Sequence, residues 1–227
     1  MSPHRSFAMP AWWTAGALLG KVVSVQDPQG LARVQVQLLG PDADNEAALW
    51  ARVAVPFAGD NRGAFLIPDV DDEVLVVLVG GEARSPVVVG GLWNGATAVP
   101  ESLGGDRVDR WTITGRNGTR VAIVEAGSGE EKVEIETPAG VSATLTDAGG
   151  GSITLEAAGN TLSLDPQGVS IEAAAKVTVQ AAQVEVSAGQ VTVNAGISRF
   201  SGVVQCDMLI SNSVISTSYS PGAGNIW

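Results

Sequence analysis

Residues 153–193 read ITLEAAGNTLSLDPQGVSIEAAAKVTVQAAQVEVSAGQVTV, and this stretch contains a short repeat. Pairs of aliphatic residues separated by one polar residue begin at positions 153, 162, 169, 177, 184 and 191, in steps of 9, 7, 8, 7 and 7 residues. Apolar and polar residues that alternate with a period of two are typical of a β-strand with one apolar face. A short repeat of such strands predicts a β-solenoid or β-helix.

The length of the repeat favours an assembly of several chains. One coil of a single-chain, three-faced β-helix needs three strands and three turns, or roughly 18 residues at about 3.3 Å per residue. A unit of seven or eight residues supplies one face, whereas three chains that each give one strand per coil can enclose a core. We therefore expect residues 111–227 to form an intertwined trimeric β-helix or β-prism. Its expected core consists of Ile153, Leu155, Leu162, Leu164, Val169, Ile171, Val177, Val179, Val184, Val186, Val191 and Val193.

An antiparallel meander, in which each chain pairs its own strands through hairpins, is the alternative. Hairpins need turn residues that accept positive φ angles, above all Gly and Asn. The connections Ala173-Ala174-Ala175-Lys176 and Ala181-Ala182-Gln183 are not hairpin turn sequences. The weak turn signals within 172–195 count against the meander there, and both arrangements stay open.

The first part of the chain has a different pattern. Residues 20–95 contain five short apolar or alternating segments separated by turn signals such as Asp27-Pro28-Gln29-Gly30. Five strands in about 75 residues predict a small closed barrel of the oligonucleotide/oligosaccharide-binding (OB) type. We expect residues 1–19 to be an N-terminal arm and residues 96–110 to be a linker. The fold class is thus all-β, with an OB-type barrel followed by a trimeric spike-like segment.

The charge balance argues against several classes of partner. The chain has 24 acidic and 13 basic residues, which gives a formal net charge of −11. Such a chain is repelled by nucleic acid and by anionic membranes, because affinity for both comes largely from cationic side chains. An OB barrel that binds oligonucleotides would also need basic and aromatic residues on its strands.

Catalytic and metal chemistry have few candidate groups. His4 is the only histidine and Cys206 the only cysteine, so zinc sites and Ser-His or Cys-His catalysis are not expected. A polysaccharide-cleaving β-helix would need clustered charged groups along one groove, and no such cluster stands out. We therefore expect no cofactor, no metal and no enzymatic activity.

The N-terminal residues lack the features of a signal peptide or a membrane anchor. Residues 11–20 are apolar, but only Arg5 precedes them as a fixed charge and no clean small-x-small cleavage site follows. No stretch reaches the roughly 20 apolar residues of a membrane-spanning helix. We expect synthesis in the cytoplasm without a signal peptide.

The barrel region resembles the corresponding domain of phage baseplate assembly protein V and of VgrG spikes. The segments that carry the resemblance are 20–23, 30–36, 50–59, 63–76 and 86–94. Where the family usually has Gly before Asp-Glu, this chain has Asp71, which is a small departure. The C-terminal residues 202–227 look like those of spikes from extracellular, phage-tail-derived particles.

The resemblance implies a structural role. Spikes of this family sit at the centre of a baseplate, next to inner tube and baseplate proteins, and puncture the target envelope when a sheath contracts. The target membrane would be contacted only transiently, and the particle would be phage-like or extracellular. Because the barrel begins near residue 20, we expect a separate hub protein at the barrel end. A non-catalytic carbohydrate-binding or adhesin-like β-helix is the alternative function.

Two sets of residues are candidates for partner contacts. Trp12 and Trp13 would dock on the hub or pack against the barrel. The C-terminal residues would bind a PAAR-like tip or cargo protein, or would form a self-contained cap of the trimer. These residues are Tyr219, Pro221, Gly222, Gly224, Asn225, Ile226 and Trp227.

Overall fold

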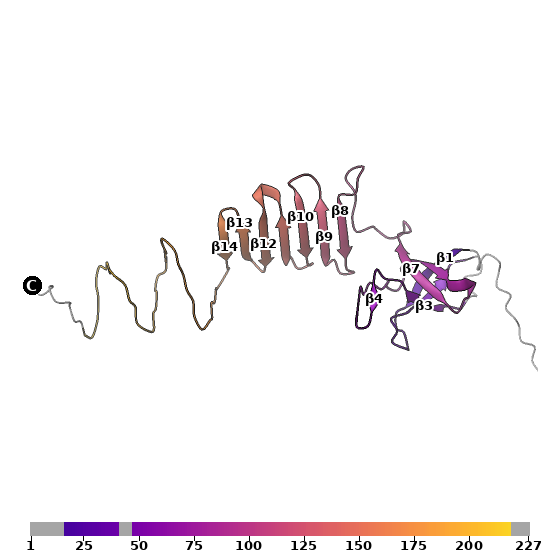
Figure 1. Ribbon diagram of the computed structural model, residues 1–227, viewed down its shortest axis with the longest axis horizontal. Helices are drawn as coiled ribbons and strands as arrows, with labels where there is room; N and C mark the ends of the chain where they lie inside the picture. The colour runs from indigo at the N-terminus through magenta and orange to yellow at the C-terminus, as the bar shows by residue number, and fades with distance from the viewer. Residues whose placement is uncertain (1–15, 41–46, 219–227) are drawn as a thin grey trace, which may run out of the picture. The chain divides into compact units, whose positions relative to one another are not determined.

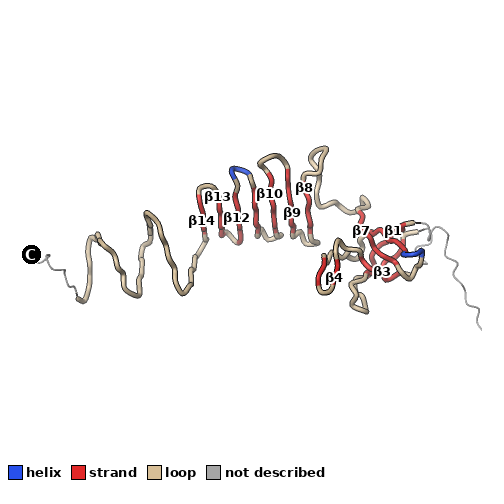
Figure 2. The backbone as a smooth tube through the Cα atoms, in the orientation of Figure 1, coloured by secondary structure: helices blue, strands red, loops and turns tan. Residues whose placement is uncertain are grey.

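The computed structural model describes residues 16–40 and 47–218, and its regular structure is almost entirely β (Figures 1 and 2). Two short 3-10 turns, η3 (Val79–Gly81) and η4 (Ala148–Gly150), are the helical segments of the described chain. The chain divides into two units after Lys176. The prediction of an all-β fold is therefore confirmed.

Five strands close into a barrel in the first unit. Their order is β1-β2-β3-β7-β6, and β6 pairs back onto β1. The β3–β7 pair is parallel, and the other pairs are antiparallel. This five-stranded closed barrel confirms the predicted OB-type domain. Its strands are β1 (Ala17–Ser24), β2 (Val34–Leu38), β3 (Leu49–Val53), β6 (Glu73–Leu78) and β7 (Pro86–Leu92).

The barrel core is aliphatic and small. Alternate residues of each strand point inward, as the two-residue period requires. At Gly20 the strands approach so closely that an added Cβ would lie 2.3 Å from Cγ1 of Val36, so no larger residue fits without a shift. The buried core side chains are Leu18, Val22, Val34, Val36, Leu38, Ala51, Val74, Val76, Leu78 and Val88.

The connection from β1 to β2 is organised by one carboxylate. Asp27 accepts hydrogen bonds from the backbone N–H groups of Gln29, Leu31 and Arg33. It also forms an ion pair of 2.7 Å with the Arg33 guanidinium, which in turn lies 5.6 Å from the ring centre of Trp50. The predicted turn at Asp27–Gly30 is therefore present, and its carboxylate ties the loop to β2.

A small hairpin leaves the barrel between β3 and β6. It consists of β4 (Ala58–Gly59) and β5 (Arg62–Gly63), which pair only with each other. In Figure 1 the strand labelled β4 lies outside the closed barrel.

Seven further strands form a single antiparallel sheet in which each strand pairs with the next in sequence. Hairpin turns connect them, with glycines at positive φ such as Gly118 (φ 89°) and Gly140 (φ 79°). The strands are β8 (Arg110–Thr114), β9 (Arg120–Glu125), β10 (Glu131–Glu136), β11 (Ser142–Thr146), β12 (Ser152–Ala157), β13 (Asn160–Asp165) and β14 (Gly168–Glu172).

This sheet corrects part of the expectation for residues 111–227. Between β8 and β14 the chain pairs with itself, so the meander, which the sequence left open, is the arrangement of these strands. Hairpins form here because glycines with positive φ recur between the strands as far as Gly168. The later glycines Gly189, Gly196 and Gly202 do not adopt positive φ, and the hairpins end before them. Whether three such sheets build a prism stays a prediction.

The second unit has no strand within its described residues, 177–218. There the chain follows a regular zigzag path (Figure 1), and its backbone makes no ladder with itself. The aliphatic pairs of the repeat continue into this segment without a hydrogen-bonding partner strand of the same chain.

Candidate functional site: an exposed aliphatic ladder

One face of the seven-stranded sheet carries two continuous rows of apolar side chains. The registers place each residue directly opposite its neighbour in the next strand, so that each row crosses the sheet from β8 to β14. The first row is Trp111, Ile123, Val133, Leu145, Ile153, Leu164 and Val169. The second row is Ile113, Val121, Ile135, Ala143, Leu155, Leu162 and Ile171. We call these two rows the aliphatic ladder.

The aliphatic ladder is largely exposed in a single chain. Trp111 is 52% exposed and Ile113 is 61% exposed at one edge of the sheet, and Val169 and Ile171 reach 69% and 64% at the other. Soluble proteins rarely expose apolar patches of this extent unless another molecule covers them. The ladder is therefore the surface that most clearly requires a partner.

The opposite face of the sheet is mostly polar, although Ala122 and Val124 of β9 are buried on it. A row of mostly hydroxyl-bearing residues lies between the two apolar rows in sequence but points to the other side, because successive side chains of a strand alternate. This contrast makes the sheet two-faced, with one face suited to burial and one suited to water. The central polar row is Thr112, Ala122, Glu134, Thr144, Thr154, Ser163 and Ser170.

A group of ion pairs lies on the polar face near β8–β10. The Arg120 guanidinium binds Glu101 at 2.6 Å and Glu134 at 2.8 Å, and Arg110 also approaches Glu101 at 3.5 Å. The hydrogen bond from Arg120 lowers the pKa of Glu101, and that from Lys132 lowers the pKa of Glu134. Partly exposed ion pairs add little stability, so the main consequence is positional: the linker at Glu101 is held on the sheet.

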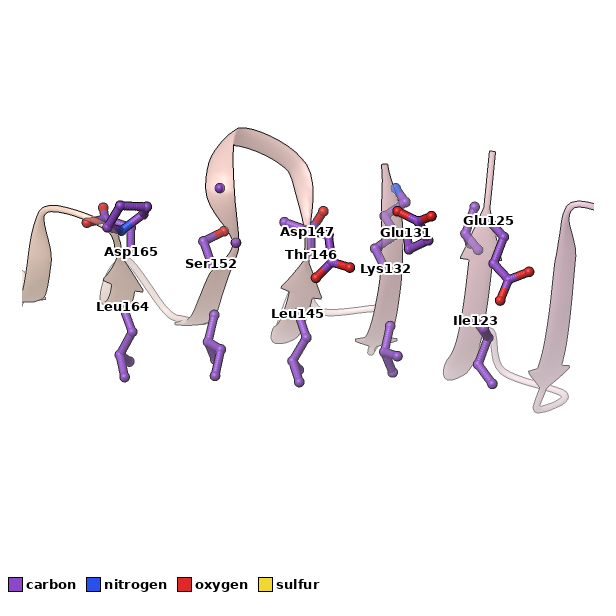
Figure 3. Close-up of a pocket in the computed structure, with 16 residues that line it drawn as sticks. Ile123, Glu125, Glu131, Lys132, Leu145, Thr146, Asp147, Ser152, Leu164 and Asp165 are labelled. Carbon is purple, nitrogen blue, oxygen red and sulfur yellow. The ribbon is translucent and has the colours of Figure 1, made fainter. Parts of the chain in front are cut away.

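A shallow, open depression of about 750 Å³ runs along the first row of the ladder. In Figure 3 the side chains of Ile123, Leu145 and Leu164 point to the same side, whereas carboxylates gather toward the turns at one end of the strands. Small-molecule sites are usually enclosed, so an open apolar surface of this kind suits a macromolecular partner better. The carboxylates in the lining are Glu125, Glu131, Asp147 and Asp165.

The structure brings half of the expected trimer core together. Ile153, Leu155, Leu162, Leu164, Val169 and Ile171 share the ladder face of β12–β14. The other half lies in the unpaired second unit, where every one of these side chains is exposed: Val177, Val179, Val184, Val186, Val191 and Val193. Trp12, Trp13 and the candidate tip residues Tyr219–Trp227 lie outside the described residues.

The ladder begins earlier in the sequence than the expected core residues. The motifs at 121–123 and 133–135 are looser copies of the repeat, and the structure places them in the same rows. The residues at 111–113 and 143–145 follow the same apolar-polar-apolar pattern. Longer turns such as Gly127–Glu130 break the seven-residue period in this region, which is why the repeat was less visible.

No metal-binding cluster is seen in the described part of the chain. Within residues 16–40 and 47–218, no three His, Cys, Asp or Glu side chains are placed to hold a metal ion. Cys206 is exposed and unpaired by disulfide. The same residues include no helix with the length and apolarity needed to cross a membrane.

Comparison with known families agrees with both halves of this architecture. Residues 18–93 match the Type VI secretion system/phage-baseplate injector OB domain. Residues 132–197 match the phage baseplate V C-terminal trimerisation domain. Together the two matches span more than half of the chain. The chain belongs to the phage baseplate V family.

Curated relatives of this baseplate V chain are spike proteins of the Type VI secretion system in Pseudomonas aeruginosa. The chain is 32% identical to VgrG1a over 78 residues, which is 34% of this chain and 12% of that relative. It is 32% identical to VgrG4b over 98 residues, or 37% of this chain and 12% of the relative. With VgrG5 it shares 39% identity over 75 residues, or 31% of this chain and 9% of the relative. The matched regions thus span only about a tenth of each relative.

The trimerisation-domain match covers one continuous segment of this baseplate V chain. It runs from β10 past β14 to residue 197. It therefore includes most of the aliphatic ladder and the aliphatic pairs of the second unit up to Val193.

Proposed function

We propose that this chain is a structural spike protein, and that it trimerises through the aliphatic ladder at the centre of a contractile injection baseplate. The observation that carries the proposal is an exposed, continuous apolar ladder inside a segment that matches a trimerisation domain. Three copies of the two-faced sheet can turn their ladders inward and their hydroxyl-bearing faces outward. The product would be a rod with an apolar axis and a polar surface.

The energetic reason is the apolar surface that one chain leaves in water. Fully burying a Val, Leu or Ile side chain contributes roughly 1.5–3 kcal/mol. A half-exposed residue of the ladder therefore still has on the order of 1 kcal/mol to gain. Because the ladder crosses seven strands, the summed gain favours association of chains over isolation.

The second unit supports an intertwined arrangement farther along the rod. Backbone N–H and C=O groups are normally paired with protein or water. The described residues 177–218 form no backbone–backbone hydrogen bonds with their own chain. Three such segments, each adding one strand per coil, would pair these groups with the other copies. The aliphatic pairs from Val177 to Val193 would then continue the apolar axis.

Membership of the family supports a position at the centre of a baseplate. In this proposal a hub protein binds the barrel end, with Trp12 and Trp13 as contact residues, and inner tube and baseplate proteins lie behind it. A PAAR-like tip or cargo protein binds at Tyr219–Trp227. Sheath contraction drives the rod through the target envelope, and the chain acts mechanically, without catalysis. The chain is made in the cytoplasm and assembled into a phage-like or extracellular particle.

The test is the solution mass of matched variants. Leu155→Asp places a charge in the ladder, whereas Thr154→Asp places the same charge on the polar face of the same strand. We expect light scattering to give three times the chain mass for the wild type and for Thr154→Asp, and less for Leu155→Asp. A monomeric wild type, or a trimer that tolerates both variants equally, would contradict the proposal.

A further inference from the structure

The barrel carries a hairpin flanked by exposed apolar side chains that its own core does not use. Phe57 and Phe65 flank the β4–β5 hairpin and are 57% and 80% exposed, and Leu66 follows at 52%. We call these three side chains the hairpin patch. Exposed aromatic residues that converge on one protruding element are typical anchors of protein interfaces.

A second apolar surface lies on the outside of the same barrel. Leu19 of β1 is opposite Leu75 of β6, and Val77 of β6 is opposite Val87 of β7. Together with Val89, these five outward-pointing side chains form what we call the wall patch. Leu19 and Val89 are 43% and 45% exposed. The outside of a small closed barrel normally faces water, so a wall patch across three paired strands indicates a binding surface.

Two different patches are what a threefold ring needs. In a cyclic trimer each contact is heterologous, because one protomer offers one surface and its neighbour offers another. We propose that the hairpin patch of one protomer docks on the wall patch of the next, so that three barrels close a ring. This inference rests on the proposed trimer and adds to it a specific contact between barrels.

Charges around the two patches are compatible with this docking. At the rim of the wall patch, Lys21 and Glu73 are cross-strand neighbours of opposite sign, although Lys21 already pairs with Asp71 of its own chain at 2.7 Å. The tip of the hairpin carries Asp60 and Arg62, which are also one of each sign. An exchange of opposite charges between copies would set the orientation of the hairpin, which is the main contribution of exposed charges at interfaces.

The contact between the hairpin patch and the wall patch is small, so it needs chains that another segment already holds together. Stable contacts between free proteins usually bury at least about 1,000 Å² in total, and a three-residue patch on a small hairpin falls short of that. When another segment already holds the chains together, the second contact becomes intramolecular and its effective concentration rises to the millimolar range. A small apolar contact is then sufficient to order the ring.

Disulfide trapping tests this contact in the full-length chain. In a Cys206→Ser background, Phe65→Cys is combined with Leu19→Cys and treated with a mild oxidant. A disulfide needs Cα atoms within about 7 Å, so a link reports close approach. We expect covalent dimers and trimers on a non-reducing gel. The matched control combines Phe65→Cys with Gln35→Cys on β2, and we expect it to stay as single chains.

The outcomes separate this contact from the trimer itself. A trimeric mass with links between chains only in the first pair supports the ring. A trimeric mass without such links, or with links confined to one chain, overturns the ring and leaves the proposed spike intact. A monomeric mass would overturn both.

A second variant tests the same contact without introduced cysteines, in case the double-cysteine variant folds poorly. Val77→Ser removes apolar surface from the wall patch and leaves the hairpin sequence unchanged. We expect the trimeric mass to persist while trypsin cleaves after Arg62 several-fold faster than in the wild type. An unchanged cleavage rate in a folded trimer would count against the docking.

Discussion

A single carboxylate governs the loop between β1 and β2. Asp27 is 3% exposed in its side chain and accepts hydrogen bonds from three backbone N–H groups as well as from Arg33. The pKa of Asp27 lies well below its ordinary value, and the hydrogen bond from the Arg33 side chain is the largest cause of this shift. At the residue scale, this side chain therefore acts as an acid-sensitive support of the barrel.

We predict that Asp27→Asn lowers the thermal midpoint of the barrel by several degrees at neutral pH. Because the folded-state pKa is depressed, the unfolded chain binds the proton more readily, and the stabilisation is complete above the unfolded pKa of about 3.9. It is lost as the pH falls toward the folded pKa. The difference between wild type and variant should therefore shrink below about pH 4, as measured by circular dichroism melts.

The control for this prediction is Asp106→Asn, which removes an exposed carboxylate from the linker. We expect its midpoint to match that of the wild type across the same pH range. Equal losses in the two variants would mean that net charge, and not the Asp27 contacts, determines the effect.

At the scale of elements, the two halves of the repeat differ in where their strands find partners. Strands β8–β14 are joined by hairpins and pair within the chain, whereas residues 177–218 make no strand pairs with their own chain. We predict that amides between Val177 and Val193 are strongly protected from hydrogen exchange in the trimer. In the Leu155→Asp variant they should exchange at rates near those of an unfolded chain.

The amides of β6 and β7 provide the internal reference, because their ladder closes within the barrel of one chain. They should be equally protected in both proteins. Fast exchange of residues 177–193 in a protein with a trimeric mass would contradict the intertwined arrangement and leave the meander as the sole source of contacts.

At the scale of the whole molecule, charge repulsion opposes assembly. Each chain has a formal net charge of −11, so three chains together carry three times that charge. Raising the salt concentration from about 0.01 M to about 1 M shortens the screening length from about 30 Å to about 3 Å. We predict that the thermal midpoint of the trimer rises by a few degrees over this range, as measured by calorimetry.

Salt also weakens the attractive ion pairs of Arg120 within each chain, and this effect would lower the thermal midpoint. A midpoint that falls with salt would show that these pairs outweigh the repulsion between chains. The sign of the salt effect thus distinguishes the two electrostatic contributions.

The barrel was predictable because its signals are local. The polar-apolar alternation in residues 34–38 predicts the two faces of β2, and the apolar run at 73–79 predicts a strand where β6 lies. Turn residues such as Asp27 and Gly30 mark where strands end. The order of the strands around the barrel, with β3 parallel to β7, depends on contacts between distant segments and is seen only in the folded structure.

The sequence predicted which residues form the apolar face of the candidate interface, but it did not decide which strands pair. Ile153, Leu155, Leu162 and Leu164 were expected to share an apolar face, and they do. Their pairing within one chain was not expected, because a spacing of seven to nine residues fits both a hairpin and one strand of an intertwined coil. The positive φ of glycines such as Gly159 decides for the hairpin, and this angle is a property of the folded chain.

The sequence by itself determined that this protein is a β-rich chain with a barrel, a repeat of two-faced strands and a strongly acidic balance. These properties follow from side-chain polarity at a period of two residues and from simple counts of charge. Only the tertiary structure decided which strands pair with each other. It also showed that the two apolar rows run unbroken from β8 to β14 and that a single chain leaves them exposed. The physical reason is that strand register is set by hydrogen bonds between segments far apart in the chain, whereas alternation is set within each segment.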